Sequence, residues 1–308
     1  MTREETTALF AKRLDAMNRH EVGDLTTFYA QDCVVESPTA GGVVQGLPTV
    51  EAIDRAWFSG FPDVVLTTED LLIDGEQIAW IGRFGGTDTG GFMGLPPTGK
   101  AFALPMVMLA TLHDRHIVHE RRIYDFTGML VQIGILKAKA IGSMAAPLAR
   151  SAAPATESTR PSQADASRTS REDVVHLLAR RDEAWARHDV NLIAEQHADT
   201  CLMDSHLEGP VTGRPAIRRL YEAWFGAFPD SGLAPEDVLI DDEHVAETAV
   251  LSGTDTGGFL GLPPTGKPFR LPVVWLFTVR HGQFDYVRPV YDFTGMLVQI
   301  GVLKAKPA

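Results

Sequence analysis

The chain has 308 residues, with 28 Lys and Arg against 40 Asp and Glu, and a formal net charge of -12. This balance argues against nucleic-acid binding and against an anionic membrane surface, because both need clustered basic side chains. No apolar stretch reaches the roughly 18 residues of a membrane helix, and the polar start differs from a signal peptide, so we expect a cytoplasmic protein.

Helices come first in the predicted order of elements. Apolar residues at three- and four-residue spacing predict a helix within the first 30 residues, a short helix from Asp24 and a third helix from Thr49. After Pro62 the pattern becomes that of strands. The predicted strands span 73–81, 102–112 and 117–124. Helices followed by strands predict an α+β fold, with helices on one face of a curved antiparallel sheet.

The second half of the chain repeats the first half. Residues 86–105 and 253–272 are identical at 17 of 20 positions, and residues 124–140 and 291–307 at 15 of 17. Self-similarity of this kind indicates two copies of one structural unit. We call them copy one and copy two.

A segment rich in Ala, Ser, Pro and Thr separates the two copies. It lacks a helical or strand period, which is typical of a linker. We therefore predict a domain at 1–140, a flexible linker at 141–170 and a second domain at 171–308. Because a fused pair commonly replaces a homodimer, we expect the two domains to pack as an intramolecular pseudo-dimer.

Two motifs occur in the same order in each copy. The first reads GTDTGGFMGLPPTGK at residues 86–100, and the second, YDFTGMLVQIG, begins at Tyr124 and again at Tyr291. With helices before strands, these motifs resemble the SnoaL-like polyketide cyclase, or ester cyclase, branch of the NTF2-like superfamily. The resemblance covers nearly everything but the linker. It implies two tandem cone-shaped NTF2-like domains, each with a pocket for a mostly apolar small molecule and neither with a cofactor.

The sequence departs from that family at two positions of the implied pocket. The family usually carries a His in the first motif, where this chain has Asp88 and Asp255. Cyclases of the family carry a catalytic Asp on the last strand, at the positions of Arg122 and Pro289. Neither Arg nor Pro can act as a carboxylate base. The family's intramolecular aldol mechanism is therefore not expected to operate unchanged.

In copy one we expect Asp88 and Glu36 to be the catalytic pair. Two carboxylates in one dry cleft would supply an acid and a base at the same pH. Arg122 would stabilise an enolate oxygen, or alternatively form a salt bridge with Glu120 or Glu36. The alternative for Asp88 is a turn carboxylate bonded to its own backbone. The side chains expected to contact substrate are Glu120, Tyr124 and Trp80.

In copy two we expect Asp255 and Asp204 to take the catalytic roles. The expected substrate-binding residues of this copy are His206, Glu247 and Tyr291. Two Asp and a His could hold a metal ion, but their spacing is not diagnostic, and we expect no metal. Because Pro289 cannot replace Arg122, the two pockets have diverged.

Other polar and thiol positions are predicted to be structural. Asp125 and Asp292 precede short helical segments and are predicted N-caps. Cys33 and Cys201 lie within apolar runs at matching places and are predicted to be buried strand thiols.

The resulting functional prediction is a cofactor-free enzyme with carboxylate acid–base chemistry. Its substrate would be a hydrophobic, carbonyl-bearing small molecule of polyketide-like character. The reaction would be cyclisation, isomerisation or elimination after proton abstraction beside the carbonyl. One alternative is a non-catalytic small-molecule-binding module, and another is a hydrolase that acts on an epoxide-like substrate through an activated water.

Overall fold

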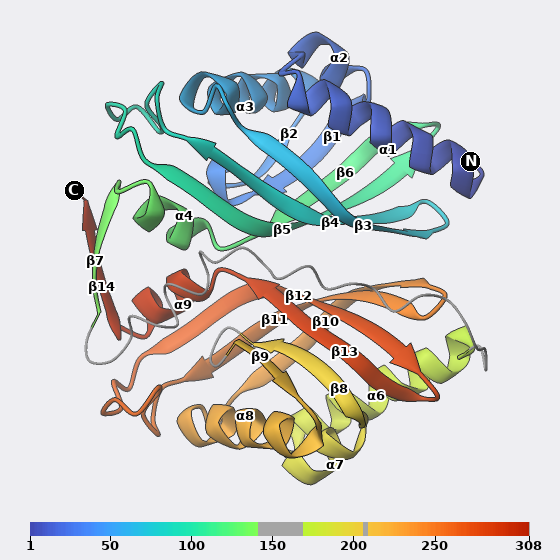
Figure 1. Cartoon of the computed structure of the whole chain (residues 1–308), viewed down its shortest axis with the longest axis vertical. Helices are drawn as coiled ribbons and strands as arrows, with labels where there is room; N and C mark the ends of the chain where they lie inside the picture. The colour runs from blue at the N-terminus through green and yellow to red at the C-terminus, as the bar shows by residue number, and fades with distance from the viewer. Residues whose placement is uncertain (141–168, 206–208, 308) are drawn as a thin grey trace. The chain divides into compact units, whose positions relative to one another are not determined.

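The structure is a computed structural model that describes residues 1–140, 169–205 and 209–307 (Figure 1). It divides into two compact units, made essentially of residues 1–137 and 138–305. The predicted linker lies almost wholly outside the described residues, and so does His206.

Copy one contains the three predicted helices and a sheet of six strands. The helices are α1 (Arg3–Asn18), α2 (Val22–Thr26) and α3 (Leu47–Gly60). The sheet strands are β1 (Tyr29–Ser37), β2 (Gly42–Gln45), β3 (Val65–Asp74), β4 (Gln77–Thr87), β5 (Ala101–His113) and β6 (His116–Ile123). The remaining elements are the 3-10 turn η1 (Pro38–Ala40), the helix α4 (Phe126–Gln132) and the strand β7 (Leu136–Ala140).

The strands of copy one are ordered β2-β1-β6-β5-β4-β3. Neighbours pair antiparallel except for β1 and β6, which run parallel, so the sheet is mixed and not wholly antiparallel as predicted. Parallel pairing requires a long connection, and here α3 and the strands β3 to β5 lie between the two partners in the chain. Figure 1 shows α1 and α3 against one face of this sheet, as the sequence predicted.

The helix α1 carries one charged side chain into the interior. Its start is fixed by a capping box, in which the Thr2 hydroxyl accepts from the Glu5 N–H and the Glu5 carboxylate accepts from the Thr2 N–H. Phe10 and Met17 are buried on the sheet side. Arg13 follows Phe10 by three residues and shares this face, so its guanidinium is buried as well.

The helix α3 carries a carboxylate into the interior. Asp54 follows Val50 by four residues, and Trp57 and Phe58 follow Asp54 by three and four residues, which places them on one helical face. Three of them are apolar or aromatic and pack toward the sheet. Asp54 is carried inward with them and keeps only 3% of its surface exposed.

Copy two repeats this architecture. Its elements are α6 (Arg171–Ala186), α7 (Val190–Glu195), β8 (His197–Ser205), β9 (Gly209–Thr212), α8 (Arg214–Ala227), β10 (Gly232–Asp241), β11 (His244–Thr254), β12 (Pro268–Arg280), β13 (Gln283–Tyr291), α9 (Phe293–Gln299) and β14 (Leu303–Pro307). The strand order is β10-β11-β12-β13-β8-β9, with β8 parallel to β13. Figure 1 shows α6 and α8 against one face of the copy-two sheet.

The predicted N-caps and buried thiols are confirmed. The carboxylate of Asp125 accepts from the N–H of Gly128 at 2.8 Å, and Asp292 makes the equivalent bond at the start of α9. A Cβ at Gly128 would lie 2.4 Å from a carboxylate oxygen of Asp125, so the cap requires glycine there. Cys33 and Cys201 are free and buried on β1 and β8.

The strand β6 of copy one contains an irregularity in its pairing with β5. Thr111 pairs with His119 and Leu112 with Ile117, so Val118 is the extra residue of a β-bulge. Because of the bulge, Val118 and Glu120 do not lie on the same face of the sheet. No helix in the described part of the chain is long and apolar enough to cross a membrane.

Candidate active site in copy one and its counterpart in copy two

An apolar cavity lies between the helices and the sheet of copy one. Its volume is about 40 Å³. Much of its wall is Met and Phe, including Met17, Met106, Met108 and Phe84. Trp57 and Phe58 of α3 are only half-buried. The cavity wall is therefore most accessible on the α3 side.

A buried cluster of charged and phenolic groups stands at one side of this cavity. Glu120 on β6 has no exposed surface. Its carboxylate accepts from the Arg13 guanidinium at 2.8 Å, from the Tyr29 hydroxyl at 2.7 Å and from Arg122 Nε at 2.5 Å. Burial alone would raise the pKa of Glu120, but the guanidiniums of Arg122 and Arg13 hold that pKa below its usual value. Glu120 is therefore an anion that fixes both guanidiniums.

Asp54 is the carboxylate that lines the cavity itself. One of its oxygens lies 3.8 Å from a terminal nitrogen of Arg122, which also lines the cavity. At this distance the two groups form an ion pair, but they are too far apart for a direct hydrogen bond. Burial raises the pKa of Asp54, although Arg122 and Arg13 partly oppose that rise. The Asp54 carboxylate therefore binds a proton more tightly than that of an exposed Asp.

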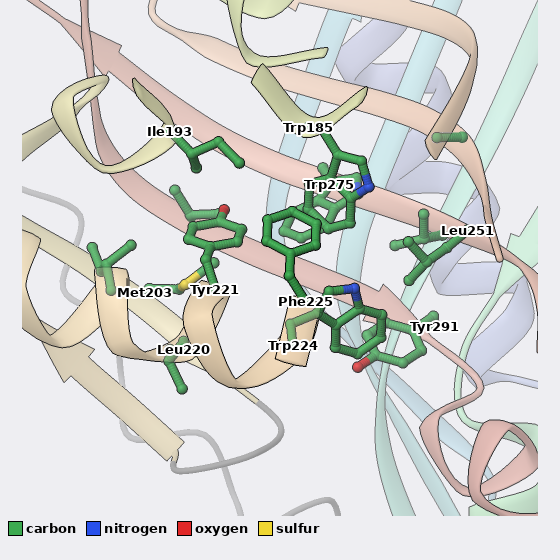
Figure 2. Close-up of a cluster of buried hydrophobic side chains, with 14 of the residues drawn as sticks. Trp185, Ile193, Met203, Leu220, Tyr221, Trp224, Phe225, Leu251, Trp275 and Tyr291 are labelled. Atoms are coloured by element: carbon green, nitrogen blue, oxygen red, sulfur yellow. The ribbon is translucent and has the colours of Figure 1, made fainter. Parts of the chain in front are cut away.

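The counterpart cavity in copy two has lost these charges. Its volume is about 50 Å³. Tyr221 stands at the position of Asp54, and Pro289 stands at the position of Arg122. Figure 2 shows the side chains of Trp185, Trp224 and Trp275 grouped with those of Tyr221 and Tyr291, and all five residues line the cavity. Copy two therefore presents an aromatic wall where copy one presents a carboxylate and a guanidinium.

Copy two keeps the first helix's buried arginine but pairs it differently. Arg181 occupies the position of Arg13, and its guanidinium donates to the carboxylate of Glu247 on β11. Val287 stands where Glu120 stands in copy one, so the counter-ion has moved from one strand of the sheet to another. The Arg181 guanidinium also lies 5.2 Å from the ring centroid of Trp275.

The family model for SnoaL-like polyketide cyclases matches residues 8–133 and, separately, residues 175–300. The two matches together cover most of the chain. The chain belongs to the SnoaL-like polyketide cyclase family. Both copies are thus SnoaL-like domains, as the sequence predicted.

Several solved structures are similar to a single copy of this SnoaL-like chain. A putative SnoaL-like polyketide cyclase from Jannaschia sp. CCS1 is 26% identical, with a TM-score of 0.40, over 45% of this chain and 97% of that one. IdmH, a putative polyketide cyclase from Streptomyces antibioticus, is 24% identical, with a TM-score of 0.37, over 41% of this chain and 97% of that one. AclR, a putative hydroxylase from Streptomyces galilaeus, is 22% identical, with a TM-score of 0.39, over 43% of this chain and 83% of that one. No curated protein matches the chain.

The aspartates of the first SnoaL-like motif are bound by their own loops. Asp88 is fully buried, and its carboxylate accepts from the Thr98 hydroxyl at 2.8 Å, from the Thr98 N–H at 3.0 Å and from the Gly91 N–H at 3.2 Å. Asp255 makes the same three bonds in copy two, with Thr265 and Gly258. The cavity wall includes neither aspartate. These contacts are those of the turn carboxylate that was the alternative prediction for Asp88.

The expected partners of these aspartates lie elsewhere. Glu36 on β1 contacts His119 at 2.9 Å and Arg121 at 3.3 Å, and it is half-buried. Asp204 lies 3.7 Å from Arg288. Each carboxylate thus has basic partners of its own, and neither is part of the described cavity wall.

The predicted substrate-binding residues fall into three groups. Tyr124 and Tyr291 line the cavities of copy one and copy two. Glu120 and Glu247 are buried ion-pair partners of arginines and are not part of the cavity walls. Trp80 is also buried, and its indole N–H donates to the Thr68 hydroxyl at 2.8 Å.

Sequence reasoning missed Asp54, Arg13 and Tyr29. The sequence held a signal for the first two, because each interrupts an apolar helical face at a position that otherwise predicts burial. Within the described residues, no group of three or more His, Cys, Asp or Glu side chains is placed to hold a metal ion.

Proposed function

We propose that copy one is a cofactor-free acid–base enzyme acting on a hydrophobic, carbonyl-bearing small molecule. The observation that carries this proposal is Asp54, a buried carboxylate in the wall of an apolar cavity, 3.8 Å from the Arg122 guanidinium. Membership of the SnoaL-like polyketide cyclase family supports the same kind of enzyme. A polyketide-like substrate fits the Met- and Phe-rich wall, because such walls bind apolar carbon skeletons.

The proposed first step is proton transfer from the carbon beside the carbonyl. The C–H bond breaks, its proton goes to the Asp54 carboxylate, and its electron pair forms an enolate. Burial of Asp54 favours this step, because burial raises its pKa and makes the carboxylate a stronger base than an exposed Asp. Protonated Asp54 is neutral and no longer compensates the positive charge of Arg122. The cavity wall then binds a negatively charged enolate oxygen more favourably.

Arg122 is the proposed partner of the enolate oxygen. Its Nε–H is held by Glu120, so its terminal N–H groups are the ones available on the cavity side. A guanidinium in a water-poor site stabilises a developing oxyanion strongly. Glu120 acts here as a positioning residue, because it fixes Arg122 without lining the cavity. The enolate then attacks a second carbonyl, takes a proton at another carbon or expels a leaving group, which gives cyclisation, isomerisation or elimination.

The experiment measures deuterium uptake beside the carbonyl of small cyclic ketones in deuterated water, followed by NMR. Asp54→Asn is expected to slow the enzyme-dependent exchange at least about 100-fold, the usual contribution of a general base. Asp88→Asn is the matched control, because it changes another buried Asp of the same copy. If Asp88→Asn or Glu36→Gln abolished exchange and Asp54→Asn did not, the pair predicted from the sequence would replace Asp54 in this proposal.

An intramolecular pseudo-dimer, a cytoplasmic location and the exact reaction stay predictions. An epoxide-type hydrolase is separated from the proposed enzyme by oxygen-18 water, because only the hydrolase would place that oxygen in its product.

A further inference from the structure

The two oxygens of the Glu120 carboxylate have different partners. Oε1 accepts from Arg122 Nε at 2.5 Å. Oε2 accepts from the Tyr29 hydroxyl at 2.7 Å and from the Arg13 guanidinium at 2.8 Å. An arginine and a carboxylate often pair through two parallel hydrogen bonds, one to each oxygen. Here Arg122 bonds to one oxygen of Glu120, because the other oxygen already has two donors.

The terminal nitrogens of Arg122 are therefore left for the cavity, which this residue lines. One of them, Nη2, lies 3.5 Å from the Tyr29 hydroxyl and 3.8 Å from an oxygen of Asp54. The first distance is at the limit of a hydrogen bond, and the second is beyond it. Nη2 can consequently form a shorter bond to a substrate oxygen without first breaking a strong one.

Tyr29 is the residue that joins Glu120 to its surroundings. It begins β1, keeps only 3% of its surface exposed and pairs with Ile117 of β6, the strand that carries Glu120. Its hydroxyl donates to Glu120 and accepts from Arg13 at 2.5 Å. The cavity wall does not include Tyr29. Tyr29 can therefore act on a bound molecule only through a neighbour, and Arg122 is the neighbour that lines the cavity.

Copy two lacks this phenol together with the groups around it. His197 stands at the position of Tyr29, and Val287 stands at that of Glu120. The His197 ring bonds to the carbonyl oxygen of Ile193 at 2.9 Å, at the end of its own helix. Copy two keeps the buried arginine of its first helix, but no arginine lines its described cavity. The phenol is thus found with the cavity arginine and not with the first-helix arginine alone.

We propose that Tyr29 and Arg13 are positioning residues for the reaction of copy one. By holding Oε2 of Glu120, they prevent Glu120 from pairing with Arg122 through both oxygens. The terminal N–H groups of Arg122 then stay available to the enolate oxygen. Without the Tyr29 hydroxyl, Glu120 turns toward Arg122 and takes up a terminal N–H as well. This inference rests on the function proposed for copy one.

A double-mutant cycle tests this role on the enzyme-dependent deuterium exchange of small cyclic ketones. Tyr29→Phe keeps the ring and removes the hydroxyl, and it should lower kcat at least about tenfold, because the oxyanion donor is misplaced. KM should change less than about twofold, because the enolate forms only after the substrate is bound. In an Arg122→Gln background, Tyr29→Phe should have almost no further effect, because its route of action is already gone.

Thr68→Val is the matched control for a lost hydroxyl contact in copy one. It removes the 2.8 Å bond to the Trp80 indole without touching Glu120, and kcat should stay unchanged. Equal losses of kcat from Tyr29→Phe with and without Arg122, or a loss confined to KM, would overturn the positioning role. If Asp54→Asn left the exchange unchanged, the proposed function itself would fail, a result that the cycle does not produce.

A crystal structure of the Tyr29→Phe chain gives a readout that does not depend on turnover. We expect Glu120 to be bonded to Arg122 through both of its oxygens. A Glu120 carboxylate that keeps its orientation would contradict the proposal. Where Tyr29→Phe does not fold, Arg13→Gln is the second variant, because it removes the other donor to Oε2, and it should act in the same direction in both measurements.

Discussion

Replacing Glu120 by Gln should destabilise copy one more than any other single change of a carboxylate to its amide in that copy. Glu120 has no exposed surface and accepts hydrogen bonds from Arg13, Tyr29 and Arg122. The amide keeps one acceptor oxygen but loses the negative charge. Two buried guanidiniums would then face Asp54 alone. Removing one partner of a buried ion pair typically costs about 3–5 kcal/mol, and we expect a loss in that range for Glu120→Gln.

The matched control is Glu36→Gln. Glu36 also has two basic partners, His119 and Arg121, but its side chain is 32% exposed. Water screens such a pair, so its loss should cost less than about 1 kcal/mol. Because both carboxylates have basic partners, the difference between the stability losses of the two variants reports the effect of burial.

Urea unfolding at neutral pH, followed at separate 5-fluorotryptophan signals, measures each copy. Trp80 reports on copy one, and Trp275 reports on copy two, which should be unchanged. The pKa of Glu120 is lowered in the folded chain, so its contribution is complete above the unfolded value of 4.5 and is lost as pH falls through the folded value. The difference between Glu120→Gln and the unchanged chain should therefore shrink in acid. A loss no larger than that of Glu36→Gln would refute the reasoning.

Three further changes have expected outcomes. Burial raises the pKa of Asp182 to about 6 in the folded chain. Asp182→Asn should therefore stabilise copy two by about 1–2 kcal/mol above pH 6, and this gain should vanish below about pH 4, where the carboxyl group is protonated in both states. Thermal melts at several pH values measure the difference. Asp88→Asn should cost about 1–3 kcal/mol in urea unfolding through its lost loop contacts, and ketone exchange per folded molecule should survive. Gly90→Ala should lower the melting temperature, because its Cβ would lie 1.7 Å from a backbone carbonyl oxygen, whereas Gly23→Ala, with nothing within 4 Å, should not.

The fold could be predicted from local patterns because each copy repeats the same evidence. The helical spacing, the strand pattern and the two motifs agree in both halves, and the structure confirms the helices before the sheet and the caps at Asp125 and Asp292. The parallel pairing of β1 with β6 could not be predicted this way. It depends on contacts between segments far apart in the chain, which local periodicity does not contain.

The site was harder to predict because a carboxylate's chemistry depends on where its helix or loop turns it. Asp88 lies in the more prominent motif, yet its oxygens are bound within its own loop. Asp54 lies in α3, outside both repeated motifs, yet its place on the apolar face of that helix carries it into the cavity wall. For Arg122 the sequence left two alternatives, an oxyanion partner or a salt bridge with Glu120 or Glu36, and the structure shows it bonded to Glu120 while it lines the cavity. A charged residue on an apolar helical face was the more informative signal.

The moved counter-ion of the buried arginine limits how the two copies can be recombined. Both copies keep the arginine of the first helix, but its carboxylate comes from β6 as Glu120 in copy one and from β11 as Glu247 in copy two. A hybrid with the β4 of copy one, where Trp80 stands, and the β13 of copy two, where Val287 stands, would hold a guanidinium with neither carboxylate. Exchange of either strand alone unbalances the charge, whereas exchange of both strands together keeps one carboxylate for each arginine. These two strands must therefore be exchanged together if each buried arginine is to keep one carboxylate partner.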